Sequence, residues 1–167
     1  EINNLVLIIG KTEGHIDQSL FARTILDEKN GPPPEVNLFN EKNNGKSLLS
    51  LIEKDYVKSA HDISLGGLIT GISKMCVKGN KGIKINKSKN FINEIEYLFA
   101  EDQGRYIVEI NEKDYKKVAD ILNKNAVHFD ELGTITKNEL YINEKTKVTI
   151  DELKTFNTNW LTNYMSK

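Results

Sequence analysis

The chain has 167 residues, of which 38% are hydrophobic and 28% are charged, and its formal net charge at pH 7 is −1. One domain with one core is expected at this length, and so balanced a charge gives no general attraction to nucleic acid or to an anionic membrane. No apolar run approaches the ~20 residues that a membrane-spanning helix needs, and the single cysteine excludes an internal disulfide and favours a cytoplasmic protein.

Hydrophobic patterning predicts strands and helices that alternate along the chain. Short apolar runs bounded by turn residues are typical of strands, and they lie at residues 5–10, 56–64, 82–88, 104–110, 126–136 and 139–145, the last two as a strand pair. Helical spacing of apolar residues predicts helices at 18–26, 38–55 (interrupted near Asn44 and Gly45), 68–76, 92–103, 112–125 and 149–165, the last capped by Thr149 or Asp151. Three prolines predict an extended connector at residues 30–37. The expected fold class is α/β or α+β, a mixed β-sheet covered by helices.

Cys76 falls on the apolar face of the helix predicted at residues 68–76. Leu68 and Ile72 precede it at helical spacing, so the three side chains share one side of that helix. We therefore expect a buried small hydrophobe at this position, in preference to a nucleophile.

The segment AHDISLGGLITG, residues 60–71, joins a predicted strand to a predicted helix. Gly66 and Gly67 let the backbone turn tightly, so Ser64 lies near the helix N-terminus, where free N–H groups and the helix dipole favour an anion. Asp62, at the strand end, can bind the Mg²⁺ that accompanies a nucleotide phosphate. The segment predicts either a nucleotide site with Asp62 as metal ligand, or a plain turn in which Ser64 caps the helix.

Residues 10–19, GKTEGHIDQS, repeat the order of strand, glycine-containing loop and helix. Gly14 can let the backbone approach a phosphate, with Gln18 and Ser19 at the start of the next helix. Asp17 favours the other interpretation, because a capping carboxylate occupies the positive end of the helix that a phosphate would use.

Residues 100–106, AEDQGRY, place four polar side chains between a predicted helix and a predicted strand. Glu101, Asp102 and Gln103 can hydrogen-bond a polar ligand, and Arg105 can bind a phosphate through two parallel hydrogen bonds. A solvated loop is the alternative. The three histidines have no zinc-site spacing, so no metal set other than Asp62 is predicted, and no catalytic residue is assigned.

Five segments together resemble, in order and spacing, the small bacterial form of phosphoribosylformylglycinamidine synthase. They are GKTEGHIDQSLFARTIL, GPPPEVNL, NGKSLLSLI, AHDISLGGLITGISKM and LFAEDQGRYIVEI, and the closing WLTNYM fits as well. The resemblance covers nearly the whole chain and is to the C-terminal domain of that enzyme's second repeat, in the AIR-synthase-related superfamily. It implies that residues 1–167 are a single AIR-synthase-like C-terminal domain. An opening Glu1 in place of methionine likewise indicates a fragment of a longer polypeptide.

The resemblance implies a part in an ATP-dependent ligase of de novo purine biosynthesis. Enzymes of this family convert formylglycinamide ribonucleotide, glutamine-derived ammonia and ATP into formylglycinamidine ribonucleotide, so ATP and Mg²⁺ are the expected cofactors. The expected partners are the preceding domains of the same chain, a glutaminase subunit and a small accessory subunit. The isolated domain is expected to be inactive, because it holds only part of the cleft.

Several roles are implied by position within the family. Asp62 resembles the Mg²⁺-ligand aspartate of a His-Asp-x-Ser motif, Ser64 resembles the nucleotide-contacting serine, and Glu101–Gln103 resemble a Glu-Ser-Gln substrate motif of the first repeat. The predicted nucleotide- or phosphate-binding residues are thus Gly14, Gln18, Ser19, Ser64, Gly66 and Gly67, and the predicted substrate-binding residues are Glu101, Asp102, Gln103 and Arg105.

Two residues depart from the family pattern, Leu65 in place of an acid and Asp17 in place of a glycine. Both changes favour a degenerate or auxiliary site. Two alternatives to a working part of the ligase therefore stay open. One is a structural domain that packs against the rest of the enzyme, and the other is a domain of another ATP-dependent enzyme of the superfamily.

Overall fold

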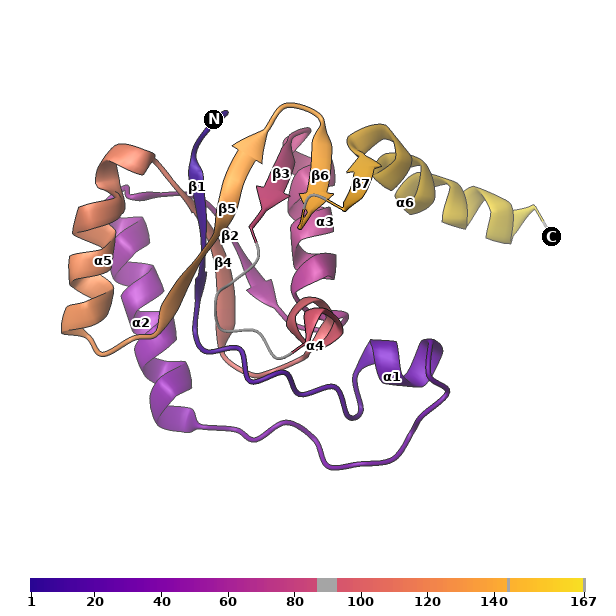
Figure 1. Ribbon diagram of the computed structural model, residues 1–167, viewed down its shortest axis with the longest axis horizontal. Helices are drawn as coiled ribbons and strands as arrows, with labels where there is room; N and C mark the ends of the chain where they lie inside the picture. The colour runs from indigo at the N-terminus through magenta and orange to yellow at the C-terminus, as the bar shows by residue number, and fades with distance from the viewer. Residues whose placement is uncertain (87–92, 144, 167) are drawn as a thin grey trace.

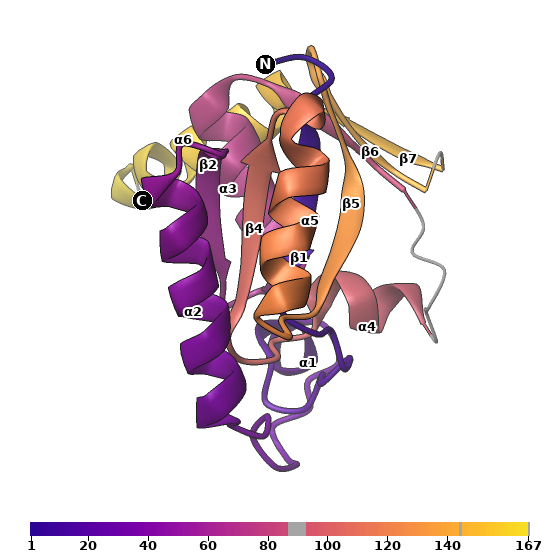
Figure 2. The ribbon, with the colours of Figure 1, turned by 90° about the vertical axis from the view of Figure 1, so that its left-hand side faces the viewer.

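The computed structural model describes residues 1–86, 93–143 and 145–166. These residues form a seven-stranded sheet with helices on both faces (Figures 1 and 2). The strands are β1 (Leu5–Ile9), β2 (Val57–Ile63), β3 (Gly82–Ile85), β4 (Arg105–Ile110), β5 (Phe129–Thr136), β6 (Glu139–Ile142) and β7 (Thr146–Thr149). The helices are α1 (Leu20–Thr24), α2 (Leu38–Glu53), α3 (Gly67–Gly79), α4 (Glu94–Phe99), α5 (Tyr115–Lys124), preceded by the 3-10 turn η1 (Glu112–Asp114), and α6 (Ile150–Met165).

The two faces of the sheet each carry a hydrophobic core, and β1 contributes to both. Val6 and Ile8 pack on the side of α3 and α4, whereas Leu7 and Ile9 pack on the side of α2 and α5. Successive side chains of a strand point to opposite faces. A strand covered on both faces is therefore apolar throughout, which is why β1 has no alternating pattern.

The order of strands is β2-β4-β1-β5-β3-β6-β7, with β3 and β6 parallel and the other neighbours antiparallel. The predicted mixed sheet is confirmed, but the predicted pairing of the last two strands was wrong, because β3 lies between β5 and β6. The connection between them crosses the start of β3 at Gly82. A Cβ atom there would overlap the backbone of Glu139, so the missing side chain makes this crossing possible.

Helix α2 is continuous, contrary to the predicted interruption near Asn44 and Gly45. The side-chain amide of Asn44 donates to the carbonyl oxygen of Gly104 at 2.9 Å, so a tertiary contact uses the polar group that would otherwise compete with the helix. The expected Thr149 cap of α6 is confirmed: its hydroxyl accepts from the N–H of Glu152, and the Glu152 carboxylate accepts from the N–H of Thr149.

Other predicted elements are present with shifted bounds. The first helix begins at Leu20, after the cap Ser19, and the connector at residues 30–37 has no regular structure, as expected. Residues 87, 88, 92 and 144 of the predicted elements lie outside the described residues. Among the helices that the described residues form, none is both long and apolar enough to cross a membrane.

Cys76 lies buried in the core beneath α3, as the sequence predicted. Burial raises the pKa of its thiol to about 12, so at pH 8 roughly one thiol in ten thousand is the reactive thiolate. We expect Ellman's reagent to label folded protein very slowly at pH 8 and to label urea-unfolded protein within the mixing time. Complete rapid labelling without urea would show that the thiol is accessible.

Candidate functional site

Several loops meet at one edge of the sheet because β4 runs antiparallel to both β1 and β2. Ile9, the last residue of β1, pairs with Tyr106, and Ile63, the last residue of β2, pairs with Arg105. The ends of β1 and β2 therefore lie beside the start of β4 and beside the loop at residues 100–104 that precedes β4. The loops at residues 10–19 and 64–66 therefore lie beside Glu101.

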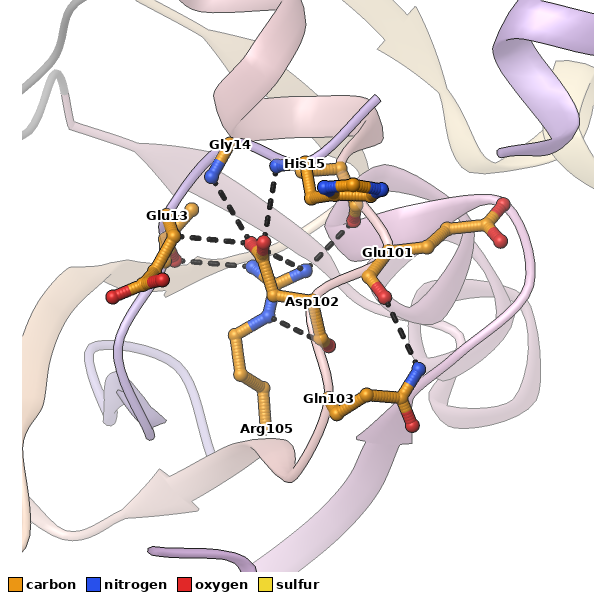
Figure 3. Close-up of polar contacts among 9 residues, drawn as sticks. Glu13, Gly14, His15, Glu101, Asp102, Gln103 and Arg105 are labelled. Atoms are coloured by element: carbon orange, nitrogen blue, oxygen red, sulfur yellow. Dashed lines mark hydrogen bonds and ion pairs between the residues drawn. The ribbon is translucent and has the colours of Figure 1, made fainter. Parts of the chain in front are cut away.

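Asp102 fastens the 10–19 loop to the start of β4. Its carboxylate accepts hydrogen bonds from three consecutive backbone N–H groups, those of Glu13, Gly14 and His15, at 3.1, 3.2 and 3.0 Å (Figure 3). Only 8% of the Asp102 side chain is exposed. Consecutive N–H groups of this kind form an anion-binding concavity, and here an internal carboxylate fills it.

Asp102→Asn should loosen this loop. The amide has one acceptor oxygen in place of two and turns an NH₂ group toward N–H donors, which costs about 1–3 kcal/mol locally. Amide hydrogen exchange at Glu13, Gly14 and His15 should therefore speed up by roughly 5- to 150-fold, as measured by NMR. Asp17→Asn, at an exposed position of the same loop, should leave these rates unchanged, and equal rates in both variants would contradict the assigned role of Asp102.

Glu101 joins the N-terminal ends of two helices. One oxygen, Oε1, accepts from the N–H of Leu20 at 2.7 Å and from the N–H of Gly66 at 2.8 Å. A carboxylate is favourable at this place because helix N-termini carry partial positive charge. Gln103, next along the loop, is exposed, and its side chain donates to the Glu101 carbonyl oxygen at 3.4 Å.

Arg105 is buried beneath the same loops, with a fully covered side chain. Its guanidinium donates to the carbonyl oxygens of Ala100 and Asp102 and to the Thr12 hydroxyl, and it lies 3.5 Å from the Asp102 carboxylate. Burial lowers the pKa of Arg105, and the charge of Asp102 opposes this change. The predicted role of Arg105 as a phosphate ligand has no support in this geometry, because its side chain is fully covered and its guanidinium donates to protein groups.

Asp62 and Ser64, in contrast, face solvent at the start of α3. The Asp62 side chain is 66% exposed, and its Oδ1 lies 3.4 Å from Nδ1 of His61. Ser64 is exposed and is not the helix cap, a position taken by Gly66 without a side-chain hydrogen bond. Within the described residues there is no group of three or more His, Cys, Asp or Glu side chains that could bind a metal ion. The Asp62 carboxylate could therefore bind Mg²⁺ only if phosphate oxygens and water supplied the other ligands of the ion.

The remaining predicted residues also have internal partners. The Gln18 side chain donates to the carbonyl oxygens of Lys29 and Gly31, and the buried hydroxyl of Ser19 caps α1. The N–H of Gly67 donates to the carbonyl oxygen of Ser64 at 2.9 Å. The structure thus brings the predicted residues together, but it directs most of their polar groups toward one another.

A polar groove of about 660 Å³ lies beside these loops, which the sequence did not predict. Its lining joins the 10–15 loop to the start of α2 and includes Lys11, Glu35, Asn40, Glu41, Asn44 and His128. The full lining comes from four separate stretches of the chain, 10–15, 34–44, 102–103 and 126–128, so no spacing in the sequence could have indicated it. Among the lining residues, only Asn44 carried a signal, because the predicted helix was expected to break there.

Comparison with known proteins gives a family and close relatives. The family model described as AIR synthase related protein, C-terminal domain, matches residues 2–143. Phosphoribosylformylglycinamidine synthase subunit PurL of Pelagibacter ubique is 63% identical over 165 residues, which are 99% of this chain and 23% of that protein. The chain spans about a quarter of the length of the curated relatives that it matches.

Solved structures from Thermotoga maritima have the same fold. PurL complexed with FGAR matches with a TM-score of 0.72 and 20% identity, over 92% of this chain and 28% of that one. PurL complexed with ATP matches with a TM-score of 0.67 and 19% identity, over 92% of this chain and 26% of that one.

Proposed function

We propose that residues 1–167 are one domain of a phosphoribosylformylglycinamidine synthase. The chain belongs to the family of AIR synthase related proteins and matches the C-terminal domain of that family. The full enzyme would use ATP and ammonia from glutamine to convert formylglycinamide ribonucleotide into formylglycinamidine ribonucleotide, a step of purine biosynthesis. The observation that carries the proposal is the 63% identity with the P. ubique subunit over almost the whole chain. A cytoplasmic location goes with this proposal.

The contribution of this domain would be one wall of a nucleotide site at the start of α3. Asp62 and Ser64 are exposed there, beside a helix N-terminus that favours phosphate. The T. maritima protein described as complexed with ATP supports ATP as the nucleotide. Mg²⁺, if bound, would neutralise phosphate charge and take Asp62 as its one ligand from this domain.

The neighbouring carboxylates would position this wall. Glu101 holds the turn at Gly66 against the start of α1, and Asp102 holds the 10–15 loop. Of the predicted substrate-binding residues, Gln103 is the exposed one, and it lines the groove in which a ligand would lie.

One observation favours a second candidate, a packing domain with a degenerate site. The backbone N–H groups that a phosphate would use in the 10–15 loop already donate to Asp102. The two candidates differ at Asp62. In a full-length enzyme, Asp62→Asn should raise the KM for ATP by about tenfold if the wall binds nucleotide, as expected for a lost contact to a charged group, and should leave KM unchanged if the domain only packs.

A hybrid polypeptide tests the proposed function. The matching segment of the P. ubique subunit would be replaced by residues 1–167, and ATP-dependent formation of formylglycinamidine ribonucleotide from formylglycinamide ribonucleotide would be measured with ammonium as the nitrogen source. We expect activity close to that of the unchanged subunit, and none when the segment is deleted. An inactive hybrid with normal folding would contradict the proposal.

Supply of ammonia by a glutaminase subunit and a small accessory subunit is part of the same proposal. It is supported by the relative in P. ubique, which is described as one subunit of the synthase.

Residues 1–167 alone should not catalyse the reaction. Correct placement of the reactants provides much of the rate of such a step, and one wall of a cleft cannot achieve it. The same assay with the purified domain should give no turnover above a protein-free blank. Turnover that copurifies with the domain would overturn this expectation.

A further inference from the structure

The C-terminal helix α6 leaves the body of the domain after its first turn (Figure 1). Ile150 is buried and Leu153 packs against the core, so the helix is anchored at its start. Its remaining large apolar side chains are between 56% and 78% exposed and are Phe156, Trp160, Leu161, Tyr164 and Met165. Five exposed large apolar side chains on one helix mark an interaction surface.

The composition of residues 155–166 supports the same conclusion. Their sequence, TFNTNWLTNYMS, has no charged residue in a chain that is 28% charged. Surfaces buried between proteins are enriched in aromatic residues and methionine and depleted in lysine and carboxylates. Threonine, asparagine and aromatic residues are also weak helix formers, so this part of α6 depends on tertiary packing for its stability.

A groove of about 500 Å³ between α3 and α6 continues this surface. Its apolar lining includes Ile69, Val77 and Phe156, and its charged residues are Lys74 and Lys78, with no carboxylate among the lining residues that the structure describes. The groove therefore fits an apolar segment that carries negative charge toward the two lysines.

The extent of the two sequence matches indicates which protein segment would cover the exposed side of α6 and the groove. The match to the domain family ends at residue 143, before α6 begins, whereas the match to the P. ubique synthase subunit covers 165 residues at 63% identity. Helix α6 therefore lies within the region that this chain shares with the synthase subunit, and outside the region matched by the domain family. About three quarters of that relative's length lies outside the match.

We propose that residues 155–166 and the groove beside α3 dock against another domain of the same synthase polypeptide, through an apolar surface with carboxylates facing Lys74 and Lys78. The proposal rests on the proposed function, which supplies the longer polypeptide. A membrane surface is a poorer occupant, because helices that lie on membranes carry Lys and Arg on their polar face, and residues 155–166 have neither.

Hydroxyl-radical footprinting of the full-length polypeptide tests the proposal, with oxidation of Trp160, Tyr164 and Met165 measured by mass spectrometry. We expect oxidation about tenfold slower than in the urea-unfolded polypeptide, because docked apolar residues are shielded from water, and equal protection at low and high protein concentration. Phe39, which is exposed on α2, serves as the unprotected reference. Unprotected rates would overturn the proposal, and protection that appears only with concentration-dependent dimers would overturn it in favour of a second copy.

A pair of variants in the same polypeptide sharpens the test. Trp160→Asp should return Tyr164 and Met165 to the unprotected rate, whereas Thr155→Asp, which is about 80° or more around the helix from each exposed apolar side chain, should leave them protected. Equal effects of the two variants would overturn the docking surface. Ligase activity measured in the same samples separates the two proposals, because protection without activity would contradict only the function, and activity without protection would contradict only the docking.

Discussion

Replacing Arg105 by methionine should lower the free energy of unfolding by about 3–5 kcal/mol, the usual cost of removing one partner of a buried ion pair. Methionine keeps much of the side-chain volume but removes every donor. The Asp102 carboxylate would then lose its buried counter-charge, and the carbonyl oxygen of Ala100 and the hydroxyl of Thr12 would lose their hydrogen bonds. Urea denaturation of the domain, followed by circular dichroism, measures the change.

Arg23 provides the matched control, because the chain has no other arginine. It is exposed at the end of α1, so Arg23→Met should change the free energy of unfolding by no more than about 0.5 kcal/mol. A loss below 1 kcal/mol for Arg105→Met would mean that the buried pair contributes little, since burial of two charges can offset their attraction.

Gly67→Ala should cost about 2–6 kcal/mol, the sum of two effects. Gly67 has a φ of +70°, a conformation that costs about 1–3 kcal/mol for a residue with a side chain. A Cβ atom would also lie 2.7 Å from the Ala100 carbonyl oxygen and 2.8 Å from the Phe99 Cα, and displacing backbone costs about 1–3 kcal/mol more. The same urea denaturation experiment measures the sum.

The other end of the same helix gives the control. A Cβ atom at Gly79 would meet nothing within 4 Å, and its φ is not positive. Gly79→Ala should therefore stabilise the domain by about 0.4–1 kcal/mol, because alanine has the higher helix propensity and fewer unfolded conformations. If both variants lost the same stability, the close contact at Gly67 would not be the cause.

The sequence was sufficient for the strands and helices wherever apolar spacing decided them. β1 and the buried face of α3 lie where an apolar run and a helical spacing predicted them. Strand order could not be predicted, because the crossing at Gly82 depends on a close approach between residues far apart in the chain. The break expected near Asn44 failed for the same reason, since its bond to Gly104 joins residues 60 positions apart.

The candidate site was likewise predictable in part. Its position at one edge of the sheet was predictable, because strand ends and helix starts attract polar residues. The direction of each polar group was not predictable: Asp102 and Arg105 have the chemistry of ligand-binding residues, yet they bind backbone groups, the Thr12 hydroxyl and each other. The local sequence shows which polar groups a residue carries. Only the fold decides whether the hydrogen-bond partner of such a group belongs to the protein or to a ligand.

The position of β1 between β4 and β5 sets when the sheet can form during synthesis. Its partners begin at Arg105 and Phe129, so about 100 further residues must be made first, which takes roughly 5–20 s at ribosomal rates. Until then the nascent chain carries LVLII, an uncharged segment of high β-propensity, without a strand to pair with. Contacts this distant in sequence also close slowly. Folding of the sheet is therefore delayed until β4 and β5 emerge, and a chaperone that shields short apolar segments would act on β1 in that interval.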